Sequence, residues 1–127
     1  MLKPGIKGYT SETVTENQTA KAVGSGELQV YATPCMIALV EKTAWESVAG
    51  NLEEGQGTVG TRLDVSHVSA TPVGMKVWCE TELIEIDGRR LVFAVKAYDE
   101  AGLIGEGTHE RFIVWNERFQ QKAEGKR

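Results

Sequence analysis

The chain has 127 residues, 41% apolar and 25% charged, a composition typical of one soluble globular domain. Its formal net charge of −4 at pH 7 argues against nucleic acid as the main partner, because proteins that bind nucleic acid carry a basic face. No apolar run reaches the ~20 residues that span a bilayer and no N-terminal targeting segment is evident, which argues against a membrane protein. We therefore expect a cytoplasmic protein with reduced cysteines and one domain over residues 1–127, loosely ordered from about residue 119.

The first half of the chain predicts one strand and one long helix. Residues 6–16 are polar but rich in β-forming side chains, which indicates a strand. Residues 17–26 are expected to form a loop, and residues 27–31 a short extended segment. Residues 33–51 predict the long helix, because apolar side chains recur there at helical spacing and a glycine follows them. The remaining elements are expected to be organised around this helix.

The predicted helix carries a carboxylate on an apolar face. Thr33 is expected to be the N-cap and Pro34 to lie in the first turn, where its missing N–H costs nothing. At about 100° per residue, the face around Glu41 is otherwise apolar; it consists of Ile37, Ala44, Trp45 and Val48. The polar side is expected to hold Lys42, Thr43 and Glu46. Glu41 is therefore predicted to be removed from water, where an isolated carboxylate is costly unless it is paired or used chemically.

The second half of the chain predicts a series of strands. The first covers residues 58–68, and after a break at Pro72 the second covers about residues 75–83. An Asp-Gly pair at residues 87–88 favours a tight hairpin into a strand over residues 91–97. The two-residue period places on one face of the second strand Met75, Val77, Cys79, Thr81 and Leu83, and on the inward face of the next Leu91, Phe93, Val95 and Ala97. The last strand covers about residues 104–114. The total is about five strands and one long helix, an α+β fold in which an antiparallel sheet wraps around a helix.

His67 shares a face with Leu63 and Val65, because side chains alternate along a strand. That face is expected to meet the helix, so His67 and Glu41 look into the same interior. Two titratable groups in a shared dry space are typical of acid–base or nucleophilic chemistry. Two structural alternatives stay open: Glu41 pairs with a Lys or Arg, and His67 is an ordinary core histidine.

Other motifs carry less information. Residues 55–60 spell G-x-G-x-x-G, but they follow a helix and open a strand, the reverse of a dinucleotide site. His109 and Glu110 lack the second histidine of a zinc protease motif. No spacing of His and Cys is typical of a metal site, so neither a metal nor a cofactor is expected.

Three segments resemble the hot dog-fold acyl-CoA thioesterases of the fluoroacetyl-CoA thioesterase-like family. The three segments are TPCMIALVEKTA, GTRLDVSHVSATPVG and GEGTHER. The resemblance covers roughly residues 30–118 and implies a hot dog fold. It implies a catalytic set of Thr33, Glu41 and His67, a backbone contact to substrate at Gly60, and an acyl pocket lined by Arg111. It also implies a coenzyme A thioester as substrate and a homodimer, alone or paired into a dimer of dimers, with active sites where the two sheets join edge to edge.

The resemblance implies chemistry in which Glu41 attacks the thioester carbonyl or activates water, His67 polarises or protonates, and Thr33 orients the substrate through its hydroxyl. Eight residues of helix separate Thr33 from Glu41 by about 12 Å, too far for a direct hydrogen bond. Residues 24–32, GSGELQVYA, lack the lid phenylalanine of the fluoroacetyl-specific enzyme, which favours a general short or medium acyl-CoA. The alternatives are a hydratase or dehydratase acting on acyl thioesters, and a non-catalytic acyl-CoA binding protein.

Overall fold

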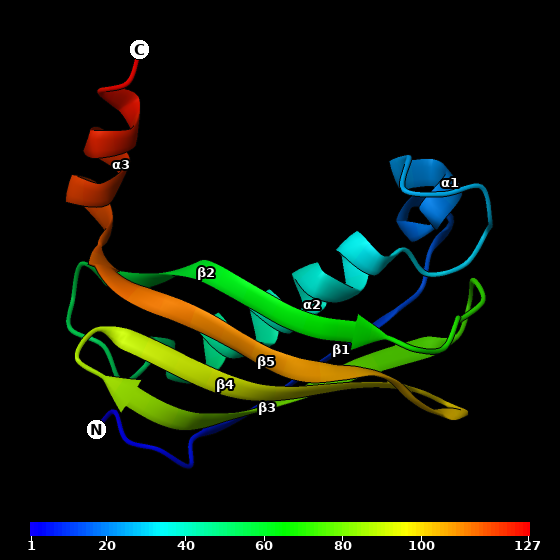
Figure 1. Cartoon of the computed structure of the whole chain (residues 1–127), viewed down its shortest axis with the longest axis horizontal. Coiled ribbons are helices and arrows are strands. Elements are labelled where there is room, and N and C mark those ends of the chain that lie inside the picture. Colours follow the sequence, from blue (N-terminus) through cyan, green and yellow to red (C-terminus); the bar gives the residue numbers. More distant parts are fainter.

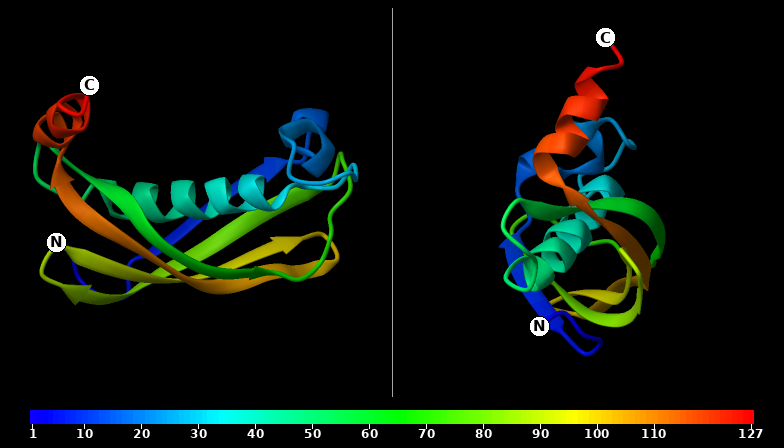
Figure 2. Two further views of the ribbon diagram at one scale, coloured as in Figure 1. Left: turned by 45° about the horizontal axis from the view of Figure 1, so that its top comes forward. Right: turned by 90° about the vertical axis from the view of Figure 1, so that its left-hand side faces the viewer.

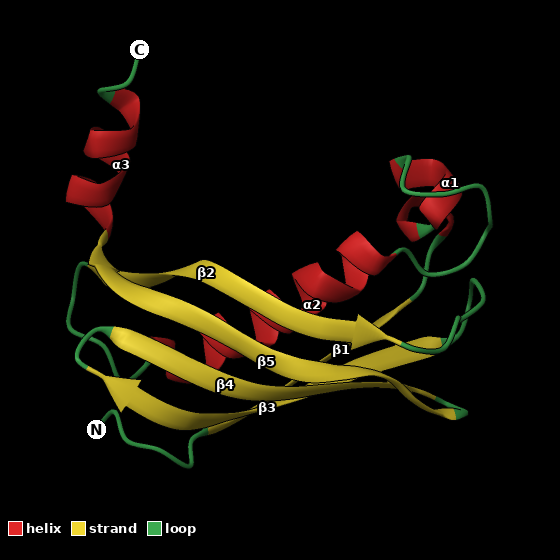
Figure 3. Ribbon diagram, in the orientation of Figure 1, coloured by secondary structure: helices red, strands yellow, loops and turns green.

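Five strands form one antiparallel sheet in the order β1-β3-β4-β5-β2, and the long helix α2 lies against one face of it (Figures 1 and 3). The structure is a computed structural model that describes residues 1–127. The strands are β1 Lys7–Thr13, β2 Gln56–His67, β3 Lys76–Asp87, β4 Arg90–Asp99 and β5 Gly102–Trp115. A sheet that curves around a central helix is the α+β hot dog arrangement expected from the sequence.

Helix α2 covers Thr33–Ala49, but it is rotated relative to the orientation predicted from its sequence. The residues that it buries are Met36, Leu39, Val40, Thr43, Ala44 and Val48. Thr43, expected on the polar side, is buried because its hydroxyl bonds the carbonyl oxygen of Leu39 at 2.7 Å and the Thr10 hydroxyl at 2.5 Å. Trp45, expected inside, is 45% exposed. Glu41 therefore lies at the border of the buried face and not at its centre.

Strands β3 and β4 supply the opposite wall of the core, as predicted. Their inward side chains alternate with less buried ones, and the inward set is Val77, Cys79, Thr81, Leu83, Leu91, Phe93, Val95 and Ala97. The Asp87–Gly88 turn also forms as predicted, with Gly88 at a φ of 62° that favours glycine. Each fully buried Val, Leu or Phe contributes roughly 1.5–3 kcal/mol to folding. This wall of the core keeps α2 against the sheet.

The segment expected to be a loop over residues 17–26 is partly helical. It contains a single 3₁₀ turn, Glu16–Gln18, and the short helix α1, Ala20–Val23. Thr19 starts α1 by accepting a hydrogen bond from the Ala22 amide at 3.1 Å. Gly24 ends it in the left-handed conformation. Of the extended segment predicted over residues 27–31, only Val30 and Tyr31 make β-bridges.

The C-terminal residues, expected to be loosely ordered from about residue 119, form helix α3, Asn116–Glu124, which extends away from the sheet (Figure 1). Figure 2 places α3 beyond one end of the body and α1 beside the N-terminal end of α2, at the other end. None of the helices combines the length and the apolarity needed to cross a membrane. Helices α1 and α3 thus lie at opposite ends of the molecule (Figure 2).

Candidate active site

Helix α2 and the edge strand β2 lie side by side and run in opposite directions. Thr33, at the start of α2, meets His67 at the end of β2. Glu41, two turns further along α2, meets Gly60 near the start of β2. The five residues predicted from the sequence are thus brought into two clusters: Thr33 with His67, and Glu41 with Gly60 and Arg111.

The first cluster joins Thr33 Oγ1 to His67 Nδ1 at 2.7 Å. The prediction that Thr33 is the N-cap was wrong, because the helix begins at Thr33 and Ala32 occupies the cap position. The hydroxyl is therefore not used for capping and bonds the imidazole. When Thr33 donates this hydrogen bond, Nε2 of His67 carries the ring proton and can donate it to another molecule.

His67 keeps its second nitrogen unused. Nε2 is buried and makes no hydrogen bond of ordinary geometry within the chain. Burial lowers the pKa of the imidazole, and the nearby Ser69 backbone opposes part of that effect. A hollow of about 330 Å³ adjoins the cluster; its lining includes Ser25, Val30, Tyr31, Thr33, His67 and Ala70. The segment between α1 and α2 thus lines a hollow beside an imidazole whose second nitrogen has no partner within the chain.

The second cluster is an ion pair between Glu41 Oε2 and Arg111 Nη1 at 3.2 Å. One of the alternatives left open by the sequence, a cation paired with Glu41, is therefore present. The Arg111 side chain is only 6% exposed, whereas that of Glu41 is 39% exposed. Thr58 holds the other side of the guanidinium, because its hydroxyl and carbonyl oxygen accept hydrogen bonds from Nε at 2.8 Å and Nη2 at 2.9 Å. Glu41 is thus anchored by a buried cation while it stays accessible to solvent.

His109 is the residue of this cluster that sequence reasoning missed. It is completely buried, and its Nε2 lies 3.1 Å from Arg111 Nη1. Its Nδ1 lies 2.8 Å from the carbonyl oxygen of Arg62, and its ring stacks on Phe93. A usable signal was present in the sequence: His109 and Arg111 are two residues apart, so they share one face of a strand.

Gly60 has no room for a side chain. A Cβ at this position would collide with Glu41 Oε2 and lie 3.3 Å from both Arg111 Nη1 and His109 Cε1. The backbone of Gly60 is not in the left-handed region, so the requirement for glycine comes from packing and not from φ. The close approach places the carboxylate directly over the strand next to its bulge, which lies between Gly60 and Arg62.

For the acyl-CoA thioesterase expected from the sequence, with Glu41 as a catalytic residue, Gly60→Ala is predicted to lower kcat for CoA release roughly 10–100-fold, because the added methyl would displace the Glu41 carboxylate. Initial rates at saturating substrate would measure this loss. Gly50→Ala is the matched control, since a Cβ at Gly50 meets nothing within 4 Å. Equal rates for the Gly60 variant and the wild type would show that the carboxylate position is unimportant.

The two histidines are expected to make stability depend on pH. Burial lowers the pKa of both His67 and His109 from the ordinary value of 6.5. Between the lowered pKa and 6.5 the unfolded state binds more protons, so the free energy of unfolding increases with pH in that window. We expect urea titrations to give a smaller free energy of unfolding at about pH 5.5 than at about pH 7.5.

The control for this pH dependence is the double variant His67→Gln with His109→Gln. Since the chain has 2 histidines, this variant should lose most of the slope between about pH 5.5 and 7.5, where carboxylates contribute little. A wild type whose stability is constant over that range would contradict the assigned burial of both rings.

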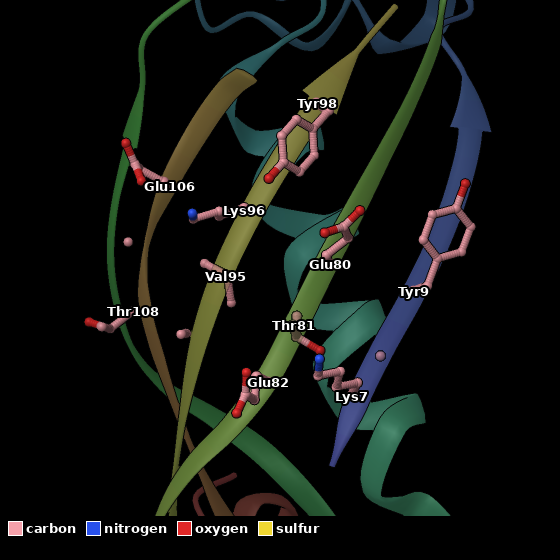
Figure 4. Close-up of a pocket in the computed structure, with 13 residues that line it drawn as sticks. Lys7, Tyr9, Glu80, Thr81, Glu82, Val95, Lys96, Tyr98, Glu106 and Thr108 are labelled. Atoms are coloured by element: carbon pink, nitrogen blue, oxygen red, sulfur yellow. The ribbon is translucent and has the colours of Figure 1, made fainter. Parts of the chain in front are cut away.

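A second, more voluminous hollow lies elsewhere. It has a volume of about 700 Å³ and lies over strands β1, β3, β4 and β5 on the face of the sheet opposite α2 (Figure 4). Its labelled side chains include Lys7, Glu80, Lys96 and Glu106, a mixture of opposite charges typical of a solvated sheet face. None of the residues of the two clusters lines it, so we do not assign chemistry to it.

The chain matches a known family and known structures over most of its length. The family described as "FlK: Fluoroacetyl-CoA-specific thioesterase" matches residues 14–117. A fluoroacetyl-CoA thioesterase from Streptantibioticus cattleyicolor is 41% identical over 98 residues, which cover 77% of this chain and 70% of the relative. The solved structure of the fluoroacetyl-CoA thioesterase FlK superimposes with a TM-score of 0.94 at 34% identity, over 100% of this chain and 98% of the other. A thioesterase superfamily member from Thermus thermophilus gives a TM-score of 0.89 at 26% identity, over 98% of this chain and 92% of the other.

The wrapped sheet and the polar clusters beside its central helix, together with these relatives, define a hot dog-fold acyl-CoA thioesterase. More narrowly, the chain belongs to the fluoroacetyl-CoA-specific thioesterase family. The family expected from the sequence is confirmed, as is the enzyme class.

Proposed function

We propose that this enzyme hydrolyses coenzyme A thioesters of short and medium acyl chains, with Glu41, His67 and Thr33 as its catalytic residues. The observation that carries the assignment is the hydrogen bonding and the exposure of the Glu41 carboxylate. Its Oε2 is held by Arg111, its Oε1 makes no hydrogen bond within the chain, and the side chain is 39% exposed. A carboxylate that is fixed on one side and accessible on the other is suited to attack or to proton abstraction.

Two mechanisms fit this carboxylate. In one, Glu41 attacks the carbonyl carbon, the C–S bond breaks, CoA leaves as the thiol, and water hydrolyses the mixed anhydride. In the other, Glu41 takes a proton from water, and the resulting hydroxide attacks the same carbon. In both, Nε2 of His67 donates a hydrogen bond to the carbonyl oxygen or a proton to the departing sulfur. Thr33 orients the imidazole through Nδ1 and lies beside the same hollow.

The two clusters support a composite site in a homodimer. Along α2 the Cα atoms of Thr33 and Glu41 are separated by about 12 Å within one protomer. Strand β2 is an edge strand, and its central residues, 60–64, are all exposed. An unpaired edge of this length is a template for another strand. We expect it to pair with β2 of a second copy about a two-fold axis.

If the two β2 strands pair antiparallel about their midpoints, the start of β2 in one protomer lies beside the end of β2 in the other. Glu41 lies at the start of its own β2, whereas Thr33 and His67 lie at the end. Glu41 of one protomer therefore faces the partner's Thr33 and the partner's His67. This arrangement resolves the 12 Å separation, because the substrate carbonyl lies between residues of two chains and not between residues of one.

The acyl range is inferred from the space beside His67. The hollow there has a volume of about 330 Å³, and the segment that covers it, residues 24–32, contains no phenylalanine. The similar structures include a mutant of the fluoroacetyl-CoA-specific thioesterase FlK in which one phenylalanine is replaced by alanine. We propose that this enzyme accepts both acetyl and fluoroacetyl groups, together with somewhat longer chains, and discriminates weakly between them.

The test is release of free CoA, read with a thiol reagent, from acetyl-, fluoroacetyl-, butyryl-, octanoyl- and palmitoyl-CoA. We expect turnover of the short and medium thioesters, with kcat/KM for fluoroacetyl- and acetyl-CoA within about tenfold. Hydrolysis of fluoroacetyl-CoA alone would contradict the broad acyl range. Hydration of crotonyl-CoA without release of CoA would instead support a hydratase.

A further inference from the structure

We propose that His109 is a positioning residue of this active site: its neutral imidazole holds Arg111, and Arg111 holds Glu41 with Oε1 free for reaction. The inference rests on the proposed catalytic role of Glu41. His109 itself touches neither the hollow beside His67 nor solvent. His109 can therefore affect the reaction only through its contact with Arg111.

The neighbours of His109 define its tautomer. Nδ1 lies 2.8 Å from the carbonyl oxygen of Arg62, which can only accept, so Nδ1 carries the proton. Nε2 lies 3.1 Å from Arg111 Nη1, which can only donate, so Nε2 offers its lone pair. A doubly protonated imidazolium would leave an N–H facing the guanidinium. The site therefore accepts one state of His109, the neutral ring protonated at Nδ1.

The electrostatics of the surroundings agree with that state. Burial is the main factor that lowers the pKa of His109, and the positive charge of Arg111 lowers it further. The Arg62 carbonyl, Glu41 and Glu110 act in the opposite direction. These are the charged and hydrogen-bonding groups that bear on the ring, and burial outweighs the three that favour protonation.

Arg111 is almost saturated by contacts within the chain. A guanidinium has five N–H donors, and hydrogen bonds to Thr58 Oγ1, Thr58 O, His109 Nε2 and Glu41 Oε2 use four of them. One Nη2 hydrogen is left. The guanidinium plane is thus held from three sides, which aims one Nη1 hydrogen at Glu41. Without the acceptor on His109, a buried N–H loses its partner and the guanidinium reorients to find another.

As a consequence, the two carboxylate oxygens of Glu41 have different surroundings. Oε2 is held between Arg111 Nη1 and the backbone of Gly60, where even a methyl group does not fit. Oε1 has no partner within the chain, so it is the oxygen that reacts. An apolar residue would fill the place of His109 without the cost of burying a polar ring, which is consistent with a role beyond packing.

The experiment compares His109→Phe with His109→Gln. Phenylalanine fills the space and stacks on Phe93 but cannot accept a hydrogen bond, whereas Oε1 of glutamine can accept from Arg111. We expect His109→Phe to lower kcat roughly 10–100-fold with KM changed less than about threefold, and His109→Gln to recover most of the loss. In an Arg111→Met background, His109→Phe should change kcat less than about twofold, because the residues act as one unit.

Three results would overturn the inference. They are wild-type kcat in a folded His109→Phe enzyme, equal losses in the Phe and Gln variants, and an undiminished effect of His109→Phe in the Arg111→Met background. Thermal unfolding of each variant separates misfolding from misplacement. If the Gln variant does not fold, ¹⁵N chemical shifts of the wild-type imidazole decide instead: the neutral ring protonated at Nδ1 is expected near pH 6.5, and a charged ring would refute the proposal.

Glu41→Gln, assayed in parallel, distinguishes failure of the proposed catalytic role of Glu41 from failure of the positioning role of His109. Wild-type kcat in that variant would remove the proposed catalytic role of Glu41. In that case the imidazole spectrum and the unfolding data would still report whether His109 anchors Arg111. Loss of activity in Glu41→Gln with full activity in His109→Phe would reject the positioning role alone.

Discussion

Glu41→Gln is expected to lower kcat for CoA release by about 10²–10⁴-fold, because an amide can neither attack the thioester carbonyl nor take a proton from water. Glutamine is close in shape to glutamate, and its carbonyl oxygen can still accept the hydrogen bond from Arg111 Nη1. The loss should therefore fall on kcat more than on KM. Thiol release at saturating acyl-CoA, with the thioester that the wild type cleaves fastest, measures it.

Glu46→Gln is the control for this substitution. Glu46 lies on the same helix and is exposed, and it makes no salt bridge in the structure. It should retain wild-type kcat. A Glu41→Gln enzyme that is folded and within twofold of the wild type would refute both mechanisms, and the ion pair with Arg111 would then be purely structural.

If the site is shared between protomers, as we propose, heterodimers of two inactive chains are expected to regain about half of the wild-type activity per dimer. One chain carries Glu41→Ala and the other His67→Ala, with different affinity tags so that only mixed dimers are isolated. In a shared site, the intact His67 of the first chain meets the intact Glu41 of the second. One of the two sites is thereby complete.

A reciprocal pair makes the heterodimer result decisive. A wild-type chain paired with a chain carrying both Glu41→Ala and His67→Ala should be inactive if sites are shared, since each site then lacks one residue. If each site is built within one chain, the outcomes exchange: the first heterodimer is inactive and the second keeps about half of the activity. Failure to isolate any dimer at micromolar concentration would refute pairing through β2.

The elements that depend on local pattern were predictable from the sequence. The long helix, the Asp87–Gly88 hairpin and the inward faces of β3 and β4 all follow from short-range periodicity and turn chemistry. The segment over residues 17–26 was predicted wrongly because its composition is typical of a loop, while one capping threonine, Thr19, is enough to start the short helix α1.

The rotation of α2 about its axis was not predictable, because two apolar stripes compete on that helix. The stripe that includes Met36 and Val40 is buried, while the one that includes Trp45 is partly exposed. Glu41 therefore moves from the predicted centre of the buried face to its border. The choice depends on the shape of the sheet against which the helix packs, and that shape is built by residues far away in the chain.

The sequence was sufficient to propose the five candidate residues through a resemblance to a family that matches residues 14–117 of the chain. Their partners depend on tertiary structure. The hydrogen bond from Thr33 to His67 joins residues 34 positions apart, and the ion pair from Arg111 to Glu41 joins residues 70 positions apart. Such contacts require a strand register, a bulge next to Gly60 and a helix rotation that no local pattern encodes. Glu41 can be recognised in the sequence, but His109 acquires its place beside Arg111 only when β5, β2 and α2 pack together.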